Sequence, residues 1–460
     1  MMQTANVQVR VDGSSGVRRR FVRTACVVVM AALVASACGS TAVDAGSEVA
    51  QTSSTSPPTS TPIVSSAEAV LVSERSRSTA DPSVAGQAIT SFGLDLFGPA
   101  RNSAPTENVT LSPTSIAIAL AMVEPGATGE AKSQLADVLH IDDPAVFHPS
   151  MNALEQELES RVLRSYGPDQ DAGELTLRIA NAAYLQAGYP FEAEYLDIIG
   201  SNYGPALNEV DFASDPAAVA HEINDWVADQ TEDRITDLLS EDAVRPETVL
   251  ALVNALYMNA SWLEPFNEAQ TANAPFTLLD GTTTDVPLMN GTGNSSSSGD
   301  GWVGATKLYT GGLYIQFILP DEGRFEEVAN RLPAVIESYP DGRTSGTTLA
   351  VPNFESRTGI ELTPSLNALG LTAPYMNGNL LGIADDPTLA VDKVLHETFI
   401  AIDEQGTEAA ASTVVLVTAT SGPRFDPVPV ILDRPFLYRI MDAETDATLF
   451  IGQIVNPTAS

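Results

Sequence analysis

Apolar residues at helical spacing mark the first part of the chain. Ser112-Pro113 pairs a good helix cap with a proline suited to the first helical turn. Residues 116–123 are apolar on every side, which predicts a buried helix. Glycines follow, and a more polar helix is predicted over 130–139. Asp215-Pro216 repeats the cap-and-proline start before an amphipathic helix.

Apolar runs of strand length dominate the later part. Residues 249–258 form a near-continuous run, typical of a strand covered on both faces. Asn254 in its middle must find hydrogen-bond partners or cost about 1–3 kcal/mol. Further strand candidates are 313–319, 347–352, 389–402, 429–432, 436–441 and 449–455. Because the predicted helices come first in the chain and the predicted strands last, we expect an α+β fold with mostly antiparallel sheets.

The stretch 406–423 has the residue composition of a β-strand, with a glycine at its start and a proline at its end. Residues 407–420 contain no glycine, proline or lysine. One alternate face has only small or β-branched residues, as a face entering a packed interior requires: Thr407, Ala409, Ala411, Thr413, Val415, Val417 and Ala419. The other face carries four polar residues: Glu408, Ser412, Thr418 and Thr420. Whether this strand is buried or exposed decides the function.

Charge and cysteine content exclude several classes of partner. The formal net charge is −36, and residues 1–37 hold five arginines against one acid, so the rest of the chain is more acidic still. Such a surface repels nucleic acid, anionic lipid and heparin-like polyanions. The two cysteines, Cys26 and Cys38, lie in the first forty residues, so the folded part has no disulfide framework.

The N-terminus has the pattern of a bacterial export signal, assigned to residues 1–37. Arginines at 18–20 and 23 precede an apolar run over 25–35, which is too short to span a membrane. The arginine order resembles a twin-arginine signal, and a Sec route stays open. Residues 33–39 resemble a lipobox with Cys38 as the lipidated residue; plain secretion is the alternative. Lipidation would be the only link to a membrane.

A tether and one folded domain follow the signal. Residues 38–82 are dominated by Ser, Thr, Ala, Pro and Val, so they are predicted to be a disordered tether. No composition break divides 83–460, which is predicted to be a single domain. The Ser- and Gly-rich piece 290–301 is predicted to be a surface loop.

No catalytic motif accompanies this fold pattern. The four histidines lack metal-ligand spacing, and neither His-Glu pair completes an HExxH motif. The chain has no Gly-x-Ser-x-Gly elbow, phosphate-binding loop or cysteine nucleophile. A Ser-His-Asp triad would have to be recognised by geometry. We therefore expect no enzyme activity, no metal and no cofactor.

Residues 403–411 resemble the hinge and reactive-centre loop of the serpin family. Segments along the folded part, from about 88 to 457, resemble serpins in the same order: 108–116, 254–257, Trp262, Phe266, Thr271, Phe276, 280–281, 286–289, 351–354, 366–370, 394–396, 434–436, 450–452 and 456–457. The resemblance implies a monomeric single domain of three β-sheets and eight or nine helices, with an exposed loop.

The resemblance also implies how the protein acts. The loop is bait for a serine protease, which cleaves it and is trapped as an acyl-enzyme when the cut strand enters the central sheet. A non-inhibitory serpin that binds a ligand or partner is the alternative. Small hinge residues suit insertion, whereas bulky or charged ones would block it.

Family roles carry over onto matching positions. The residues expected to control opening of the sheet, the shutter, are Ser112, Ser115, Asn254 and His396; the breach residue is Trp262. The loop hinge comprises Glu404, Gly406, Thr407, Glu408, Ala409, Ala410, Ala411 and Ser412. Many serpins pair Glu404 with a lysine, but Asn353 stands at that position. The breach is therefore expected to use hydrogen bonds, or Glu404 is a solvated acid.

Two positions for the cleaved bond stay open. Counting as the family does, the bond joins Thr420 and Ser421, which favours elastase-like or subtilisin-like proteases. The segment up to Pro435 is longer than usual, so Arg424 is the alternative and would suit trypsin-like proteases. Prolines near Arg424 disfavour that cut.

Overall fold

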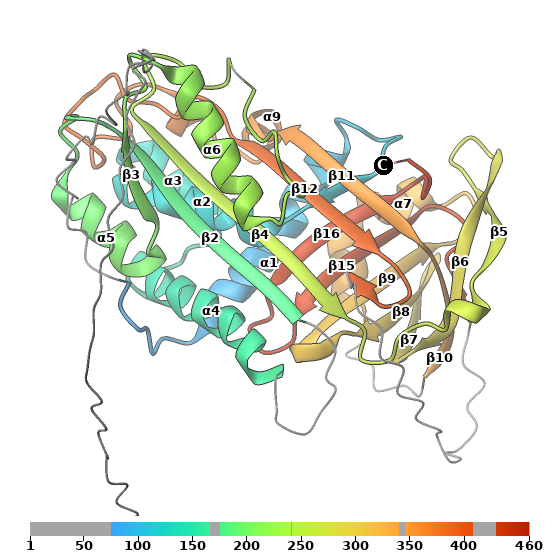
Figure 1. Ribbon diagram of the computed structural model, residues 1–460. Helices are drawn as coiled ribbons and strands as arrows, with labels where there is room; N and C mark the ends of the chain where they lie inside the picture. The colour runs from blue at the N-terminus through green and yellow to red at the C-terminus, as the bar shows by residue number, and fades with distance from the viewer. Residues whose placement is uncertain (1–74, 166–174, 241, 340–345, 408–428, 460) are drawn as a thin grey trace, which may run out of the picture. The chain divides into compact units, whose positions relative to one another are not determined.

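The computed structural model describes residues 75–165, 175–240, 242–339, 346–407 and 429–459. Figure 1 shows helices gathered in the first half of the chain and strands in the second, as expected. The helices of the described residues are α1 (Pro82–Arg101), α2 (Pro113–Val123), α3 (Gly129–Val138), α4 (Pro144–Ser165), α5 (Ala193–Tyr203), α6 (Pro216–Gln230), α7 (Phe325–Asn330), α8 (Leu332–Glu337) and α9 (Thr363–Ala368).

The central sheet has six strands. In spatial order they are β11 (Phe354–Glu361), β12 (Leu395–Ile402), β13 (Gly406–Thr407), β4 (Leu250–Ser261), β2 (Leu175–Gln186) and β3 (Ala206–Val210). All neighbours pair antiparallel except β2 and β3. Among the described residues, β13 has only two residues and bridges β4 and β12 at one end alone.

Two further sheets complete the described fold. The second sheet runs β1 (Val109–Leu111), β16 (Thr448–Ile454), β15 (Phe436–Asp442), β9 (Leu313–Pro320), β8 (Trp302–Leu308) and β7 (Ser295–Gly299). The third runs β14 (Val430–Ile431), β10 (Thr347–Pro352), β6 (Thr283–Gly293) and β5 (Ala272–Thr277). The predicted α+β class with three mostly antiparallel sheets is confirmed.

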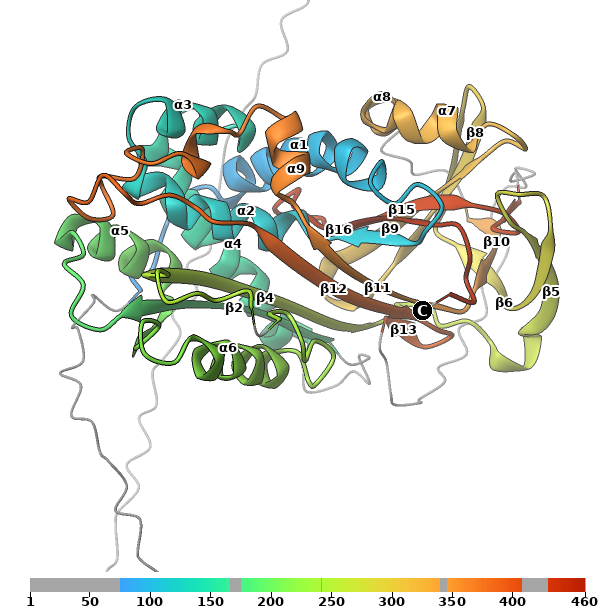
Figure 2. The same cartoon turned by 90° about the horizontal axis from the view of Figure 1, so that it is seen from above.

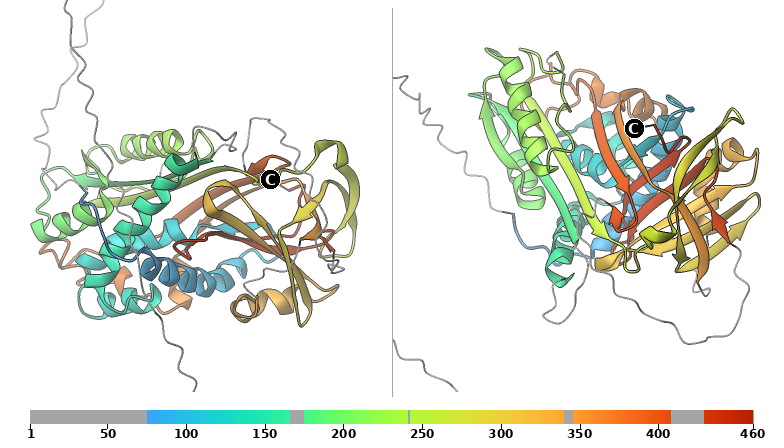
Figure 3. Two further views of the ribbon diagram at one scale, coloured as in Figure 1. Left: turned by 90° about the horizontal axis from the view of Figure 1, so that it is seen from below. Right: turned by 45° about the vertical axis from the view of Figure 1, so that its right-hand side comes forward.

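Helices cover both faces of the central sheet. Viewed from above, α6 lies on one side of β2 and β4, while α2 and α4 lie on the other (Figure 2). Apolar residues of α6 form a small core with residues of β2 and β4 such as Tyr184 and Val253. The main core fills the space among the other helices and the sheets. The two further views in Figure 3 also show α6 packed on one face of the central sheet.

The predicted buried helix and its cap are confirmed in α2. Ser112 is the N-cap and its side chain accepts a hydrogen bond from the Ser115 backbone N–H, with Pro113 in the first turn. Most of the helix is buried, as an all-round apolar helix requires. This helix carries Ser112 and Ser115 to the underside of the central sheet.

Three predicted boundaries were wrong. Residues 290–301 are not a loop: they include the end of β6 and all of β7, which pairs with β8. Hydrogen bonds between neighbouring strands join backbone groups, so they can form whatever the side chains are. The serine side chains are also small enough for Ser295 and Ser297 to be buried. The strand expected over 389–402 begins only at Leu395. Residues 75–82, assigned to the tether, contact α4 and α5 or begin α1.

None of the helices within the described ranges combines the length and apolar character needed to cross a lipid bilayer.

Candidate functional site

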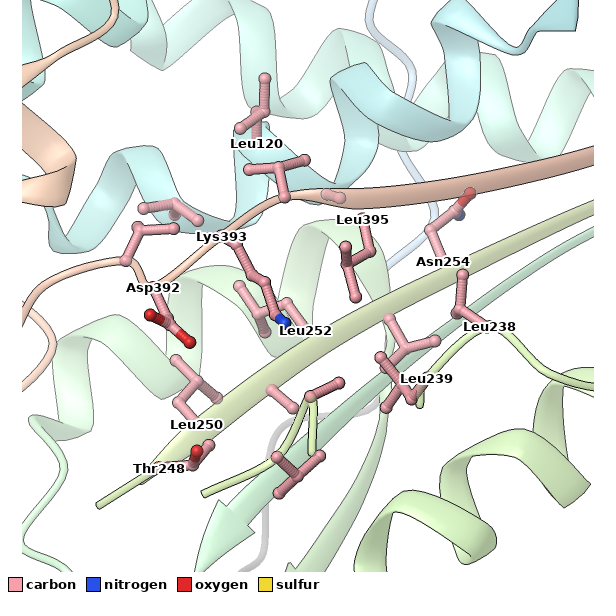
Figure 4. Close-up of a pocket in the computed structure, with 18 of the residues that line it drawn as sticks. Leu120, Leu238, Leu239, Thr248, Leu250, Leu252, Asn254, Asp392, Lys393 and Leu395 are labelled. Carbon is pink, nitrogen blue, oxygen red and sulfur yellow. The ribbon is translucent and has the colours of Figure 1, made fainter. Parts of the chain in front are cut away.

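The central sheet contains a slot between β4 and β12. Beyond Gly406–Thr407, no backbone ladder joins these two strands in the described part of the chain. A cavity of about 560 Å³ lies there instead. Its walls come from β4 and from residues 388–398, with α2 on one face and Leu238 and Leu239 on the other (Figure 4). We call this cavity the slot.

The four predicted shutter residues all line the slot. The Ser112 backbone N–H donates to Nε2 of His396 at 3.1 Å, which requires Nε2 to be unprotonated. His396 is only 6% exposed. Burial lowers the pKa of His396 to about 3, so its imidazole is neutral at physiological pH.

Asn254 is satisfied on one side only. Its Nδ2 donates to Oδ1 of Asn181 on β2 at 2.7 Å. Its Oδ1 is buried and has no hydrogen-bond partner among the described residues. A buried acceptor without a donor is costly, so a group that enters the slot and donates here gains stability.

The loop hinge enters the sheet at the end of the slot. Gly406 pairs with Ser261 and Thr407 with Ala260, while Thr407 also faces Ile402 of β12. A Cβ atom on Gly406 would lie 2.1 Å from the Ala260 carbonyl oxygen. Only glycine allows this close approach of the two backbones.

Trp262 holds the hinge from the adjoining loop. Its indole Nε1 donates to the Asp403 carbonyl at 2.9 Å, and its backbone N–H donates to the Gln405 carbonyl at 2.8 Å. The indole stacks on Tyr309 with ring centroids 4.1 Å apart. The Tyr309 hydroxyl is 2.7 Å from Oγ1 of Thr407, which is buried. The breach residue predicted from the resemblance therefore contacts the hinge directly.

Glu404 is held by a hydrogen bond. Its Oε1 accepts from the Thr271 hydroxyl at 2.6 Å, and no ion pair to Glu404 occurs within the described ranges. Asn353 makes a backbone hydrogen bond to Pro287 instead. Of the two readings of Glu404, the hydrogen-bonded breach is the one that the geometry favours.

The sequence motifs missed a buried cation at the breach. Lys307 is 1% exposed, and its Nζ donates to the carbonyls of Glu264 and Thr292 at 2.7 and 3.1 Å. It lies 4.3 Å from the centroid of the Phe266 ring. Burial lowers the pKa of Lys307 to about 8. Residues alternate between the two faces of a strand, so Lys307 shares a face with Ala305 and Tyr309. This alternation is the sequence signal that could have indicated the burial of Lys307.

No group of three or more His, Cys, Asp or Glu side chains in the described part of the chain is arranged to hold a metal ion. Several predicted site residues lie outside the described residues: Cys38, Glu408, Ala409, Ala410, Ala411, Ser412, Thr420, Ser421 and Arg424.

Comparison with known proteins decides the family. The sequence model of the family Serpin (serine protease inhibitor) matches residues 87–457. The chain belongs to the serpin family. An uncharacterized serpin-like protein of Thermococcus kodakarensis is 35% identical to this serpin over 378 residues, covering 80% of this chain and 85% of the relative.

Two further similarities bear on function. Leukocyte elastase inhibitor A of Mus musculus is 30% identical to this serpin, covering 80% of this chain and 98% of the relative. The crystal structure of human thyroxine-binding globulin complexed with thyroxine is similar with a TM-score of 0.69 and 25% identity, covering 83% and 100% of the two chains. The family thus includes members named for an inhibited protease and for a bound hormone.

Substitution of Gly406 tests the close contact at the hinge. We expect Gly406→Ala to lower the free energy of unfolding by about 1–3 kcal/mol, because the new methyl group meets the Ala260 carbonyl. Gly359→Ala is the matched control, since a Cβ on this strand glycine of the same sheet has open space. Urea denaturation of both variants measures the difference, and equal midpoints would refute the contact.

We expect acid to lower the stability of the folded protein through protonation of His396, one of the shutter residues. The unfolded chain takes up a proton near pH 6.5, whereas folded His396 does so only near pH 3. Stability from this group is therefore complete above pH 6.5 and is lost as the pH falls, by about 2 kcal/mol at pH 5. His396→Gln should remove this part of the acid dependence of urea unfolding, and His221→Gln, an exposed histidine on α6, should retain it.

Proposed function

We propose that this serpin inhibits serine-type endopeptidases as a suicide substrate and is not itself an enzyme. The observation that carries the proposal is the slot between β4 and β12, which the first two residues of the loop already enter. A strand continuing from Thr407 would find backbone partners on both sides.

Extending the register from Thr407 places the loop sequence in the slot. The antiparallel pairing of Thr407 with Ala260 and Ile402 puts Thr413 opposite both Asn254 and His396. The Thr413 hydroxyl would then reach the unpartnered Oδ1 of Asn254. The same count turns the small and β-branched face of the loop toward α2.

The opposite face also matches its surroundings. Val414 would lie opposite Val253 and Leu416 opposite Ala251, both beside the apolar core under α6. Each ladder hydrogen bond contributes about 1 kcal/mol, so a full strand gains an energy comparable to the stability of a domain. Insertion after cleavage would therefore drag the covalently attached protease and distort it.

We place the cleaved bond between Thr420 and Ser421 and favour elastase-like or subtilisin-like targets. Arg424, with trypsin-like targets, is the alternative. We further propose that the protein is exported, monomeric and lies outside the cell, held at the surface through lipidated Cys38. Plain secretion is the alternative, and a Cys38→Ser variant that stays in the membrane fraction would refute the anchor.

A ligand-binding, non-inhibitory role is the second candidate function. The similarity to thyroxine-binding globulin supports it. The small residues at 409–412 and the open slot favour insertion, and therefore inhibition, over this alternative.

Incubation with proteases tests inhibition. We expect an SDS-stable complex with an elastase-like or subtilisin-like enzyme and release of a 421–460 peptide, because insertion traps the acyl-enzyme. Mass spectrometry of the peptide locates the cut: a fragment beginning at Phe425 moves it to Arg424. Cleavage without any complex would leave the non-inhibitory role as the better account.

A charge at Thr407 should convert the inhibitor into a substrate. Thr407→Arg would force a guanidinium into a position that is 2% exposed and in contact with Tyr309. Thr407→Val is the matched control, because valine keeps the size and β-branching of threonine without adding a charge. Titration of the protease with each variant gives the moles of inhibitor consumed per mole of protease inactivated. This ratio should rise only for Thr407→Arg, and unchanged inhibition would contradict insertion.

A further inference from the structure

The chain segment just before α1 is fixed to the body of the protein by Arg75. Its guanidinium donates to the side-chain and backbone oxygens of Asn152 on α4 at 3.1 and 3.3 Å. It also pairs with Glu155 at 3.1 Å and with Glu159 at 3.3 Å. Four contacts to one helix make Arg75 a specific anchor rather than a loose surface charge.

Glu155 connects Arg75 to residues in the interior of the protein. Its side chain is fully buried, its Oε2 forms an ion pair with Arg75, and the same oxygen accepts a hydrogen bond from Nδ2 of Asn181 on β2 at 2.9 Å. Its Oε1 has no hydrogen-bond partner in the described part of the chain. Burial raises the pKa of Glu155 to about 8, while Arg75 and Asn181 act in the opposite direction. Arg75 and Asn181 therefore offset part of the cost of burying this carboxyl group.

Asn181 fixes the orientation of the Asn254 side chain in the slot. Its Nδ2 faces two acceptors, Glu155 and the Tyr203 carbonyl, so its Oδ1 must turn toward Asn254. Asn254 lies directly opposite on β4 and donates its Nδ2 to that oxygen. An amide has its donor and acceptor on opposite sides, so Oδ1 of Asn254 is left without a partner in the wall of the slot.

We propose that Arg75 and Glu155 are positioning residues for strand insertion: through Asn181 they fix Asn254 with its acceptor available to the incoming strand. The inference rests on the proposed function, since it concerns the regulation of the same slot. It makes the segment at residues 75–80 a control element, whose removal or displacement would lower the efficiency of insertion.

The continuity of the contacts supports this role over that of an isolated ion pair. Each link joins a different element, from the segment before α1 through α4 and β2 to β4. Glu155 and the Tyr203 carbonyl together orient the amide of Asn181, and Asn181 in turn orients the amide of Asn254. A Cβ on Gly204 would lie 2.8 Å from Arg75, so the end of α5 also leaves room for this side chain.

Arg75→Met tests the proposal, with Arg77→Met as the matched control. Arg77 is exposed two residues away, so its substitution removes the same charge from the same segment. Loss of one oriented hydrogen bond predicts about a five-fold fall in the ratio of trapped to released protease for Arg75→Met. Arg77→Met should behave like the unmodified protein. Equal ratios for the two variants, or more efficient trapping by Arg75→Met, would overturn the proposal.

A second readout separates this inference from the inhibitory function. The loop is nicked with a protease, and the gain in melting temperature over the intact protein reports strand insertion without any trapped complex. The gain should be smaller for Arg75→Met than for Arg77→Met. Failure of the unmodified protein to trap protease contradicts the proposed function, whereas equal gains in the two variants contradict the positioning role.

Glu155 offers a check on the pathway. Glu155→Leu removes the buried carboxyl group, and Arg75→Met combined with it should add no further loss, because both changes break one chain of contacts. Additive losses would show that Arg75 acts independently of Asn254. Far-UV circular dichroism of each variant establishes that the fold is retained.

Discussion

The missing ladder between β4 and β12 is the constraint on which the site depends. Backbone N–H and C=O groups along a strand edge require partners, and an edge inside a sheet has no water-facing side to supply them. The short strand β13 meets this need only at one end. Helix α2 lies on one face of the slot, and Leu238 and Leu239 lie on the other. The sheet would therefore gain stability from an added strand, as the proposed function requires.

The shutter groups in the slot are neutral, whereas charged side chains such as Asp392 and Lys393 line it further from the shutter (Figure 4). His396 is kept neutral by burial, and Ser112, Ser115 and Asn254 carry no charge. A strand entering at the shutter would therefore not have to desolvate an ion there. The interior acceptor that remains, on Asn254, is one that a hydroxyl group can satisfy.

Local patterns predicted elements, and only the family resemblance predicted the site. Helix α2 and strand β10 follow from nearby residues: a cap, a proline and a run of β-branched side chains. Ser112 and His396 meet across 284 positions of sequence, which no periodicity reveals. Strand β7 was missed because its stability comes from pairing with β8. Arg75 and Lys307 were missed because their partners are set by tertiary packing.

The hinge is recognised mainly through its backbone. Trp262 binds the carbonyls of residues 403 and 405, and the Phe266 N–H binds that of Glu404. Such contacts tolerate many side chains, so they do not explain why the hinge sequence is so restricted. The restriction comes from size: Gly406 meets the Ala260 carbonyl, and Thr407 fits against the Tyr309 hydroxyl. If the loop inserts as proposed, the same limit of size along the slot would apply to the run of small residues that follows, and the composition of the loop would reflect the space that the sheet leaves for it.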